Sequence, residues 1–389
     1  MQQPTIAYVM FIIFTGTAIL STLVLFTRQS LLTAYILLGA ICGPWGFKLI
    51  NDTAILEQSG SIGTIFLLFL LGLNLQPQNL FHSLKKVSAI TIFSSLVFFI
   101  SGFILGYMFG YSYTECLMIG TASMFSSTII GIKLLPTTVL HHQHTGELLI
   151  SILLLQDMIA IGIILTLEIM ASHTESMRQF QLMLGAFPAL FSLAYLVQEF
   201  VLSYLLKRYD TIHEYIFILS IGWCLFMAEF GHALGLSEEI GAFIAGIALA
   251  SNPLSFYIAE SLKPLRDFFL VIFFFTIGAG FNFGFFSVII LPALSLALLL
   301  LLIKPLTFNW LLYRSGEAKS ISKEVGVRLG QMSEFTLLVI YLALKTNMLS
   351  PLTTYMIEAA VIITFIISCY WTVLHYPTPL AISEKLRKD

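Results

Sequence analysis

The chain has 389 residues, of which 58% are hydrophobic and only 10% charged, with a net charge of −2 and a mean hydropathy of +0.93. Soluble domains carry about 25% charged residues, so this composition indicates a protein that crosses a lipid bilayer many times. It excludes nucleic acid as a partner, because no Lys/Arg-rich patch is present to contact a phosphate backbone.

Apolar runs of bilayer length follow one another along the chain, separated by polar residues or by Pro and Gly. The first run lacks the basic start and the cleavage site of a signal peptide, so we expect it to remain as a span. The sequence predicts an all-α polytopic membrane protein of about thirteen transmembrane helices, at residues 6–26, 30–49, 59–75, 87–109, 114–135, 147–170, 184–206, 213–233, 238–252, 266–282, 286–313, 325–345 and 351–374.

The basic residues are distributed very unevenly between the two sides of this layout. Fifteen of the 19 Lys and Arg residues fall on one side and three on the other, while Lys304 lies inside a span. Because basic loops stay in the cytoplasm, the N-terminus is predicted outside and the C-terminus inside. The short loops suit a bacterial inner (plasma) membrane.

Three short patterns recur at nearly one spacing, which indicates an internal duplication. Residues 39–44 resemble 241–246 at an offset of 202, and residues 68–74 resemble 274–280 at an offset of 206. The polar interruption of the fifth predicted helix recurs in the twelfth, about 205 residues later. The paired helices lie seven spans apart and cross in opposite senses, so the sequence predicts inverted repeats.

Both of these helices contain polar residues deep within the predicted span. The fifth contains Ser126, Ser127 and Thr128, and the twelfth contains Gln331 and Glu334. Such side chains can bond carbonyls of their own helix or join neighbouring helices. Their placement at the repeat spacing favours another interpretation, in which both helices unwind and direct carbonyls and helix ends at an ion site.

Asp157 is an isolated acid in the middle of the sixth apolar run. A charged acid at mid-membrane costs about 2.5–3.5 kcal/mol on insertion scales, so it is normally paired or faces a hydrated cavity. Together with Gln156, Ser127 and Thr128 it offers the oxygen ligands that a monovalent cation requires. We therefore expect Asp157 to bind a cation and a proton alternately; the alternative is a structural partner for a basic residue. No metal beyond the transported cation is expected.

Lys304 is the one basic residue deep in a span, and Pro305 follows it. It requires an anionic partner or a lowered pKa. A pair with Asp157 would be broken by cation binding, whereas a pair with Glu334, or a place beneath helix dipoles, would be structural. The residues leave both alternatives open.

Motifs for enzymatic chemistry are missing from the sequence. It contains no HExxH, GxSxG or P-loop motif and no GxGxxG in a strand context. Proteolysis and ATP-driven pumping therefore have no residues to perform them. We expect neither an enzyme nor a bound cofactor.

Taken in order, the motifs resemble the membrane domain of the second monovalent cation:proton antiporter family, within the sodium/proton exchanger superfamily, over about residues 6–374. The stretches that carry the resemblance are Ala34–Gly39 with Gly43-Pro44, Leu67–Leu73, Ser126–Thr128, Leu155–Asp157, Gly235–Ser237 with Gly241–Phe243, Lys304-Pro305, and Gly330-Gln331 with Glu334-Phe335.

The resemblance implies a membrane transport domain over residues 1–375, with a scaffold or dimerisation part and a mobile core part that contains two crossed, broken helices. It implies that Asp157 is the ion-binding aspartate, that Ser127 and Thr128 are ligands on the unwound helix, and that Lys304 is the core lysine. Alternating access by an elevator movement, and a homodimer, follow from the same resemblance. Residues 376–389 are expected to form a short cytoplasmic tail.

One departure from the family pattern bears on stoichiometry. Electrogenic members have two adjacent aspartates, whereas Gln156-Asp157 resembles the glutathione-gated potassium efflux antiporters. One titratable site predicts electroneutral exchange of one proton for one cation. Those efflux systems also have a cytoplasmic nucleotide-binding domain after the membrane part, which we do not expect here, so glutathione or dinucleotide gating would require a separate regulatory subunit.

The sequence thus predicts a K⁺/H⁺ or Na⁺/H⁺ antiporter in a lipid bilayer. Two alternatives stay open at this point. One is a ligand-gated potassium efflux channel on the same scaffold, which would pass ions without obligate proton movement. The other is a non-transporting membrane scaffold or sensor in which Asp157 and Lys304 only form a pair.

Overall fold

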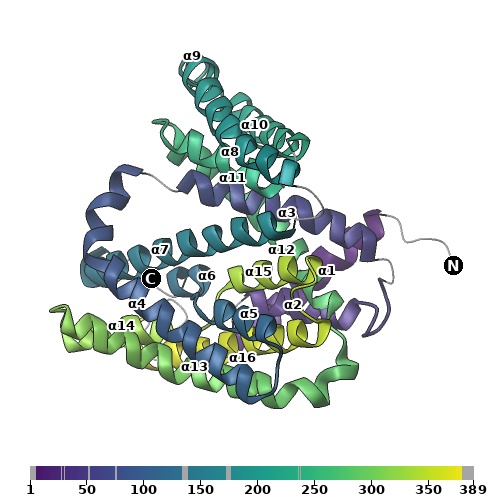
Figure 1. The fold of residues 1–389 in the computed structure, drawn as a ribbon, viewed down its shortest axis with the longest axis vertical. Coiled ribbons are helices and arrows are strands. Elements are labelled where there is room, and N and C mark those ends of the chain that lie inside the picture. Colours follow the sequence, from purple (N-terminus) through teal and green to yellow (C-terminus); the bar gives the residue numbers. More distant parts are fainter. Residues whose placement is uncertain are drawn as a thin grey trace. The chain divides into compact units, whose positions relative to one another are not determined.

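The computed structural model describes residues 6–27, 29, 31–50, 53–74, 77–133, 139–171, 177–234, 236 and 238–378. The chain forms two compact units. Unit 1 comprises residues 1–14, 50–81 and 168–276, and unit 2 comprises residues 15–49, 82–167 and 277–389. Figure 1 shows that the described part of the chain is built from helices, as the sequence predicts.

In chain order the helices are α1 (Ile6–Phe26), α2 (Leu31–Cys42), α3 (Thr53–Asn74), α4 (Pro77–Met108), α5 (Tyr113–Ser123), α6 (Thr128–Lys133), α7 (Val139–Ala171), α8 (Met177–Val197), α9 (Ser203–Arg208), α10 (His213–Ala233), α11 (Glu238–Ala250), α12 (Ser255–Gly280), α13 (Phe286–Arg314), α14 (Lys319–Arg328), α15 (Glu334–Lys345) and α16 (Pro351–His375). A π-helical segment, Gln198–Leu202, joins α8 to α9, and a 3₁₀ turn, Phe283–Phe285, precedes α13.

The helices identify an integral membrane protein. Seven helical stretches of the described chain are long and apolar enough to cross a bilayer, and two shorter apolar helices accompany them. The predicted run 213–233 is α10 to the residue. The run 30–49 was predicted too long, since α2 ends at Cys42. Pro44 disfavours a helical conformation at the residue before it, and Lys48 has a positive φ of 58°.

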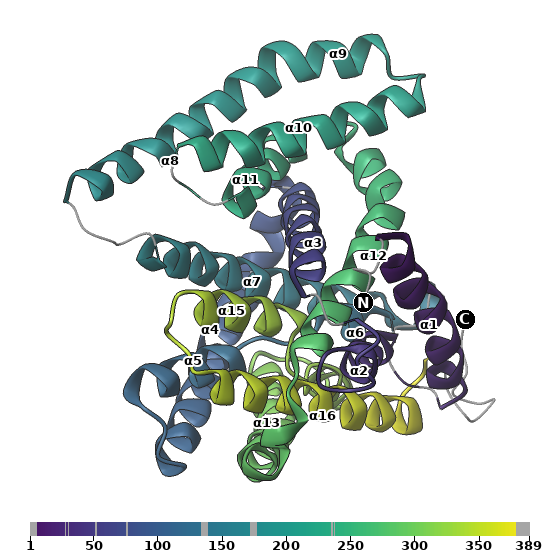
Figure 2. The ribbon, with the colours of Figure 1, turned by 90° about the vertical axis from the view of Figure 1, so that its right-hand side faces the viewer.

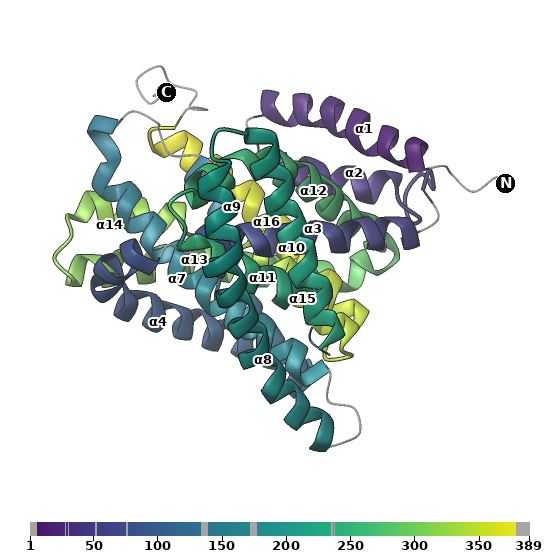
Figure 3. The ribbon, with the colours of Figure 1, turned by 90° about the horizontal axis from the view of Figure 1, so that it is seen from above.

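In unit 1, α11 lies directly against α3 (Figures 1 and 2). Glycines allow this contact: a Cβ atom on Gly246 would lie 2.1 Å from the carbonyl oxygen of Phe69, and one on Gly72 would lie 2.4 Å from that of Phe243. Next to Gly246, the Ala245 carbonyl accepts a hydrogen bond of 3.1 Å from the indole N–H of the α10 residue Trp223. Viewed from above, α8 and α10 also run side by side (Figure 3).

In unit 2, an apolar core joins four helices. It contains Phe98 of α4, Leu149 of α7, Phe308 of α13 and Leu329, which follows α14. The rings of Phe98 and Phe308 meet edge to face, with centroids 5.3 Å apart. On its other side α13 packs against α16 (Figure 2). This core positions the two helices that are interrupted, as described next.

The close approach of α3 and α11 predicts that Gly246→Ala destabilises the protein. The added methyl group would overlap a backbone carbonyl, so unfolding should become easier by about 1–3 kcal/mol. The measurement is thermal unfolding of the purified protein in detergent. Gly222→Ala, on a face of α10 with no atom within 4 Å of the added Cβ, is the matched control and should unfold like the wild type. Equal melting of both variants would contradict this packing.

Candidate ion-binding site

The fifth predicted span is interrupted where its hydroxyl residues lie. Helix α5 ends at Ser123 and α6 begins at Thr128, so that Met124 to Ser127 lie between the two helices. The Ser127 hydroxyl accepts a 3.1 Å hydrogen bond from the backbone N–H of Ile130, which caps the new helix. A side chain that satisfies a first-turn donor lets the helix restart inside the membrane.

The twelfth predicted span is interrupted in the same way. Helix α14 ends at Arg328 and α15 begins at Glu334. Ser333 has extended backbone geometry, and its hydroxyl accepts a 3.0 Å hydrogen bond from the N–H of Phe335. Each break therefore contains a serine that caps the helix following it, and the two serines are 206 positions apart (333 − 127), close to the spacing of the sequence patterns.

The two interruptions bond directly to each other in unit 2. The Ser126 hydroxyl donates to the carbonyl of Leu329 at 2.9 Å, and the Thr336 hydroxyl donates to the carbonyl of Ala122 at 2.8 Å. Both serine and threonine are fully buried. Hydroxyls of one broken helix thus satisfy carbonyls that the other leaves without a helical partner.

Lys304 of α13 lies between the breaks and is completely buried. Its ammonium donates to the carbonyl of Phe125 in the first break and to that of Gln331 in the second, the latter at 3.0 Å, and reaches the Ser126 hydroxyl at 3.4 Å. The ends of α5 and α14 that direct carbonyls here carry the negative pole of each helix. Among the described residues, no carboxylate lies within 4 Å of this ammonium. Of the alternatives that the sequence left open, the structure therefore shows the one in which Lys304 lies at the carbonyl ends of helices. Lys304 pairs with neither Asp157 nor Glu334.

Gln156 holds the first break from the side of α7. Its Oε1 accepts from the N–H of Ser126 at 3.0 Å, and its Nε2 donates to the carbonyl of Met124 at 3.2 Å. A neutral amide can do both at once, whereas an ionised carboxylate can only accept. Gln156 therefore supplies the acceptor and the donor that the Ser126 N–H and the Met124 carbonyl would find in a continuous helix.

Asp157 is 98% buried, and its carboxylate faces the start of α6. The Thr128 hydroxyl lies 3.4 Å from each of its two oxygens. Glu334, the buried first residue of α15, is near enough for its charge to act on Asp157. Both acids thus stand at helix N-termini, where the positive pole favours negative charge. All eight residues that the sequence singles out meet in this one region of unit 2.

Helix α16 contributes polar groups that sequence reasoning missed. The Ser368 hydroxyl donates to Oε1 of Gln331 at 2.9 Å, and the Thr364 hydroxyl accepts from the N–H of Met332 at 3.2 Å. Single hydroxyls are common in membrane helices, so no signal marked them. Glu358 was also missed: it is buried, and its Oε2 has no hydrogen-bond partner among the described residues. The criterion that selected Asp157, a lone acid in an apolar run, would have found it.

Comparison with known families agrees with this geometry. A family model described as "Sodium/hydrogen exchanger, transmembrane" matches residues 10–374. The chain belongs to this family. The resemblance indicated by its motifs is thereby confirmed: this sodium/hydrogen exchanger chain is an antiporter-family membrane transporter and not an enzyme.

Curated members of the family that are similar to this chain include glutathione-regulated potassium-efflux system proteins KefC. Those of Escherichia coli O45:K1 (strain S88) and Shigella flexneri are 30% and 31% identical to it over 335 residues. Each alignment covers 82% of this chain and 52% of the relative. The chain spans about half the length of the curated relatives it matches.

A solved structure has the same fold. The sodium proton antiporter MjNhaP1 from Methanocaldococcus jannaschii, at pH 8, superposes with a TM-score of 0.62. The match covers 94% of this chain and 98% of that one, at 19% sequence identity. The helical architecture is therefore shared well beyond the reach of sequence similarity.

The environment of Lys304 predicts that Lys304→Met destabilises the protein strongly. Methionine fills the space but leaves buried carbonyls without a donor, at about 1–3 kcal/mol for each group. Thermal unfolding in detergent should show the loss, and Lys304→Gln, which keeps donors, should restore part of it. Lys345→Met, on the Tyr341 ring at the end of α15, is the control. If Lys304→Met and the control melt alike, the ammonium does not hold the breaks together.

Proposed function

We propose that this chain exchanges a monovalent cation for a proton across the membrane, with Asp157 as the single group that carries them. The observation that supports this most is that different side chains bond the backbone of the breaks and face the proposed ion site. The amide of Gln156 and the ammonium of Lys304 are occupied by backbone groups, so Asp157 is free to exchange its partner. Its nearby hydroxyl ligand, Thr128, is of a type that suits an alkali cation.

Charge supplies the coupling in this mechanism. An ionised Asp157 is costly to move through the low-dielectric membrane, and either a proton or a cation neutralises it. Only the neutral, loaded forms would then cross between outward-facing and inward-facing states. Because proton and cation compete for one carboxylate, each outward step with one ligand is matched by a return with the other.

We infer potassium as the cation. One support is the name of the curated relatives, potassium-efflux system proteins. The other is the Gln156-Asp157 pair, which resembles the motif of potassium efflux antiporters noted in the sequence. Sodium is the competing substrate, since Na⁺ and K⁺ use the same oxygen ligands and are discriminated by cavity size and ligand field.

The proposed architecture follows from this function. Thirteen spans in two inverted repeats would place the N-terminus outside and the C-terminus in the cytoplasm of a bacterial inner membrane. Unit 2, with both interrupted helices, would be the mobile core, and unit 1 the scaffold that forms a homodimer. A separate regulatory subunit is a further proposal. Of the proposed tail at 376–389, residues 379–389 lie outside the described residues.

Replacing Asp157 should abolish exchange. We expect Asp157→Asn to show no cation-induced pH change in sealed, reconstituted vesicles, while the wild type responds to K⁺, Na⁺ or Li⁺ and so ranks them. Glu147→Gln changes an exposed acid of α7, the helix that also carries Asp157, and should retain exchange. Exchange that survives Asp157→Asn, or that is lost equally in Glu147→Gln, would contradict a single carrier carboxylate.

The number of titratable groups should set the voltage dependence. With Asp157 as the single carrier carboxylate, wild-type exchange should be the same whatever potential is imposed on the vesicles by a gradient of the permeant anion thiocyanate. Gln156→Asp adds a second acid beside the first, and its exchange rate should become sensitive to the imposed potential. A potential-dependent wild-type rate, with stoichiometry above one proton per cation, would overturn the electroneutral proposal.

A further inference from the structure

Helix α16 lies against both interrupted helices and is bonded to each of them within unit 2 (Figure 2). At its centre it contacts the second break through Ser368 and Thr364, as described above. Its two ends carry additional ties, one to α5 and one to α14. These ties involve two charged residues that the proposed transport mechanism does not use, Glu115 and Arg328.

The tie at the start of α16 is a carboxylate shared between two helix caps. Glu115, in the first turn of α5, accepts through Oε2 from the N–H and hydroxyl of Ser112 at 3.1 and 2.8 Å, forming a capping box. Through Oε1 it accepts from the hydroxyls of Ser350 and Thr353 of the α16 cap, both at 2.6 Å. Charge-assisted bonds of this kind are roughly twice as strong as neutral ones.

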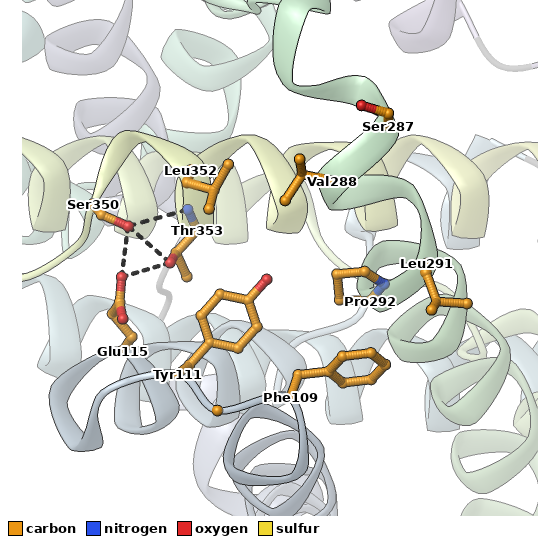
Figure 4. Close-up of a pocket in the computed structure, with 11 residues that line it drawn as sticks. Phe109, Tyr111, Glu115, Ser287, Val288, Leu291, Pro292, Ser350, Leu352 and Thr353 are labelled. Atoms are coloured by element: carbon orange, nitrogen blue, oxygen red, sulfur yellow. Dashed lines mark hydrogen bonds between the residues drawn. The ribbon is translucent and has the colours of Figure 1, made fainter.

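Figure 4 shows this tie at the wall of a cavity of about 470 Å³, on the side predicted to face outside. Tyr111 and Phe109 come from the loop after α4, and Val288 from the start of α13. The carboxylate of Glu115 points away from these side chains, toward Ser350 and Thr353. Beside this open space, the hydrogen bonds of Glu115 link α5 directly to the start of α16.

The tie at the other end of α16 is a buried arginine. Arg328, the last residue of α14, is 1% exposed. Its guanidinium donates to Oε1 of Glu324 through Nε at 3.0 Å and to the carbonyl of Pro377 through Nη2 at 2.8 Å. The Tyr376 ring lies 5.9 Å from its central carbon. Pro377 and Tyr376 directly follow α16, so one side chain joins the end of α14 to the end of α16.

The Tyr376 ring is neutral at pH 7, as that of any ordinary tyrosine is, and it faces the guanidinium as a π-system. Burial and the Glu324 carboxylate raise the pKa of its hydroxyl further. Thr378, two residues after Tyr376, is also buried. The planar guanidinium of Arg328 thus contacts Glu324, Pro377 and Tyr376 at once. A lysine could not make the same set of contacts, because an ammonium lacks two donors in one plane.

The tied half-helices, α5 and α14, lead into the two breaks that lie beside the ion site. The groups that meet at the breaks include backbone carbonyls, of Met124 and Phe125 after α5 and of Leu329 after α14. A carbonyl has no rotamer to adjust, so its position is set by the position of its helix. We propose that Glu115 and Arg328 are positioning residues of the ion site, which fix α5 and α14 to opposite ends of α16. This inference rests on the proposed exchange function.

The test measures affinity and rate separately in reconstituted vesicles, with K⁺ as the probe cation. We expect Glu115→Gln and Arg328→Met each to raise the half-saturating K⁺ concentration about tenfold, as loss of a charge-assisted bond does, with maximal rates within about twofold of wild type. Arg328→Lys should retain most of the defect. Glu147→Gln and Arg314→Met, exposed residues of α7 and α13, are the matched controls.

A second readout does not require transport. Amide hydrogen exchange should become faster at Leu329–Ser333 in Arg328→Met and within α5 in Glu115→Gln, and stay unchanged in both controls. If Arg328→Met does not fold, Tyr376→Leu removes the ring contact alone and should show a smaller change in the same direction.

The outcomes separate the two proposals. If wild-type vesicles show no cation/proton exchange, the proposed transport function is refuted. The amide hydrogen-exchange measurement would still show whether Glu115 and Arg328 hold the breaks in place. Variants that melt at lower temperature but keep the wild-type half-saturating concentration and wild-type amide exchange at the breaks would reduce Glu115 and Arg328 to general stability residues and overturn the inference.

Discussion

Two helices that stop and restart inside a membrane leave carbonyls that water cannot reach, and the ammonium of Lys304 is the group that satisfies one carbonyl from each. A lysine at this depth would be prohibitively costly without such acceptors. The cost of burying the charge and the cost of breaking the helices therefore offset each other. Because the same buried groups meet both costs, Lys304 and the two breaks form a single hydrogen-bonded unit.

The remaining site groups divide according to the polarity of the half-helices. Carbonyl ends of α5 and α14 face the cation of Lys304, while the N-terminal ends of α6 and α15 stand beside the acids Asp157 and Glu334. Gln156 then fills the hydrogen-bonding gap in the first break without adding charge. Local helix polarity thus explains why opposite charges share one buried region without forming a direct ion pair.

Much of this could be predicted from the sequence, for a physical reason. Asp157 stands out because it is the one acid in the middle of a long apolar run, and the breaks stand out because polar residues interrupt two spans about 205 residues apart. The partner of Lys304 could not be predicted, since its acceptors are backbone carbonyls, which every residue has. The end of α2 at Cys42 required weighing Pro44 against a strongly apolar run. The hydrogen bonds of Glu115 and Arg328 to α16 and the residues after it join positions that are distant in the sequence, so no local sequence pattern could predict them.

The hydrogen bonds between the two breaks also constrain how the protein is made. Ser126 and Leu329 are 203 positions apart, and Ala122 and Thr336 are 214 apart. At synthesis rates of about 5–20 residues per second, the first broken helix waits roughly 10–40 s for its partner to leave the ribosome. During that interval its unpaired carbonyls must be hydrated or sheltered by the insertion machinery. The same exposed backbone that later surrounds an ion is, in the nascent chain, a segment that the bilayer cannot yet accept.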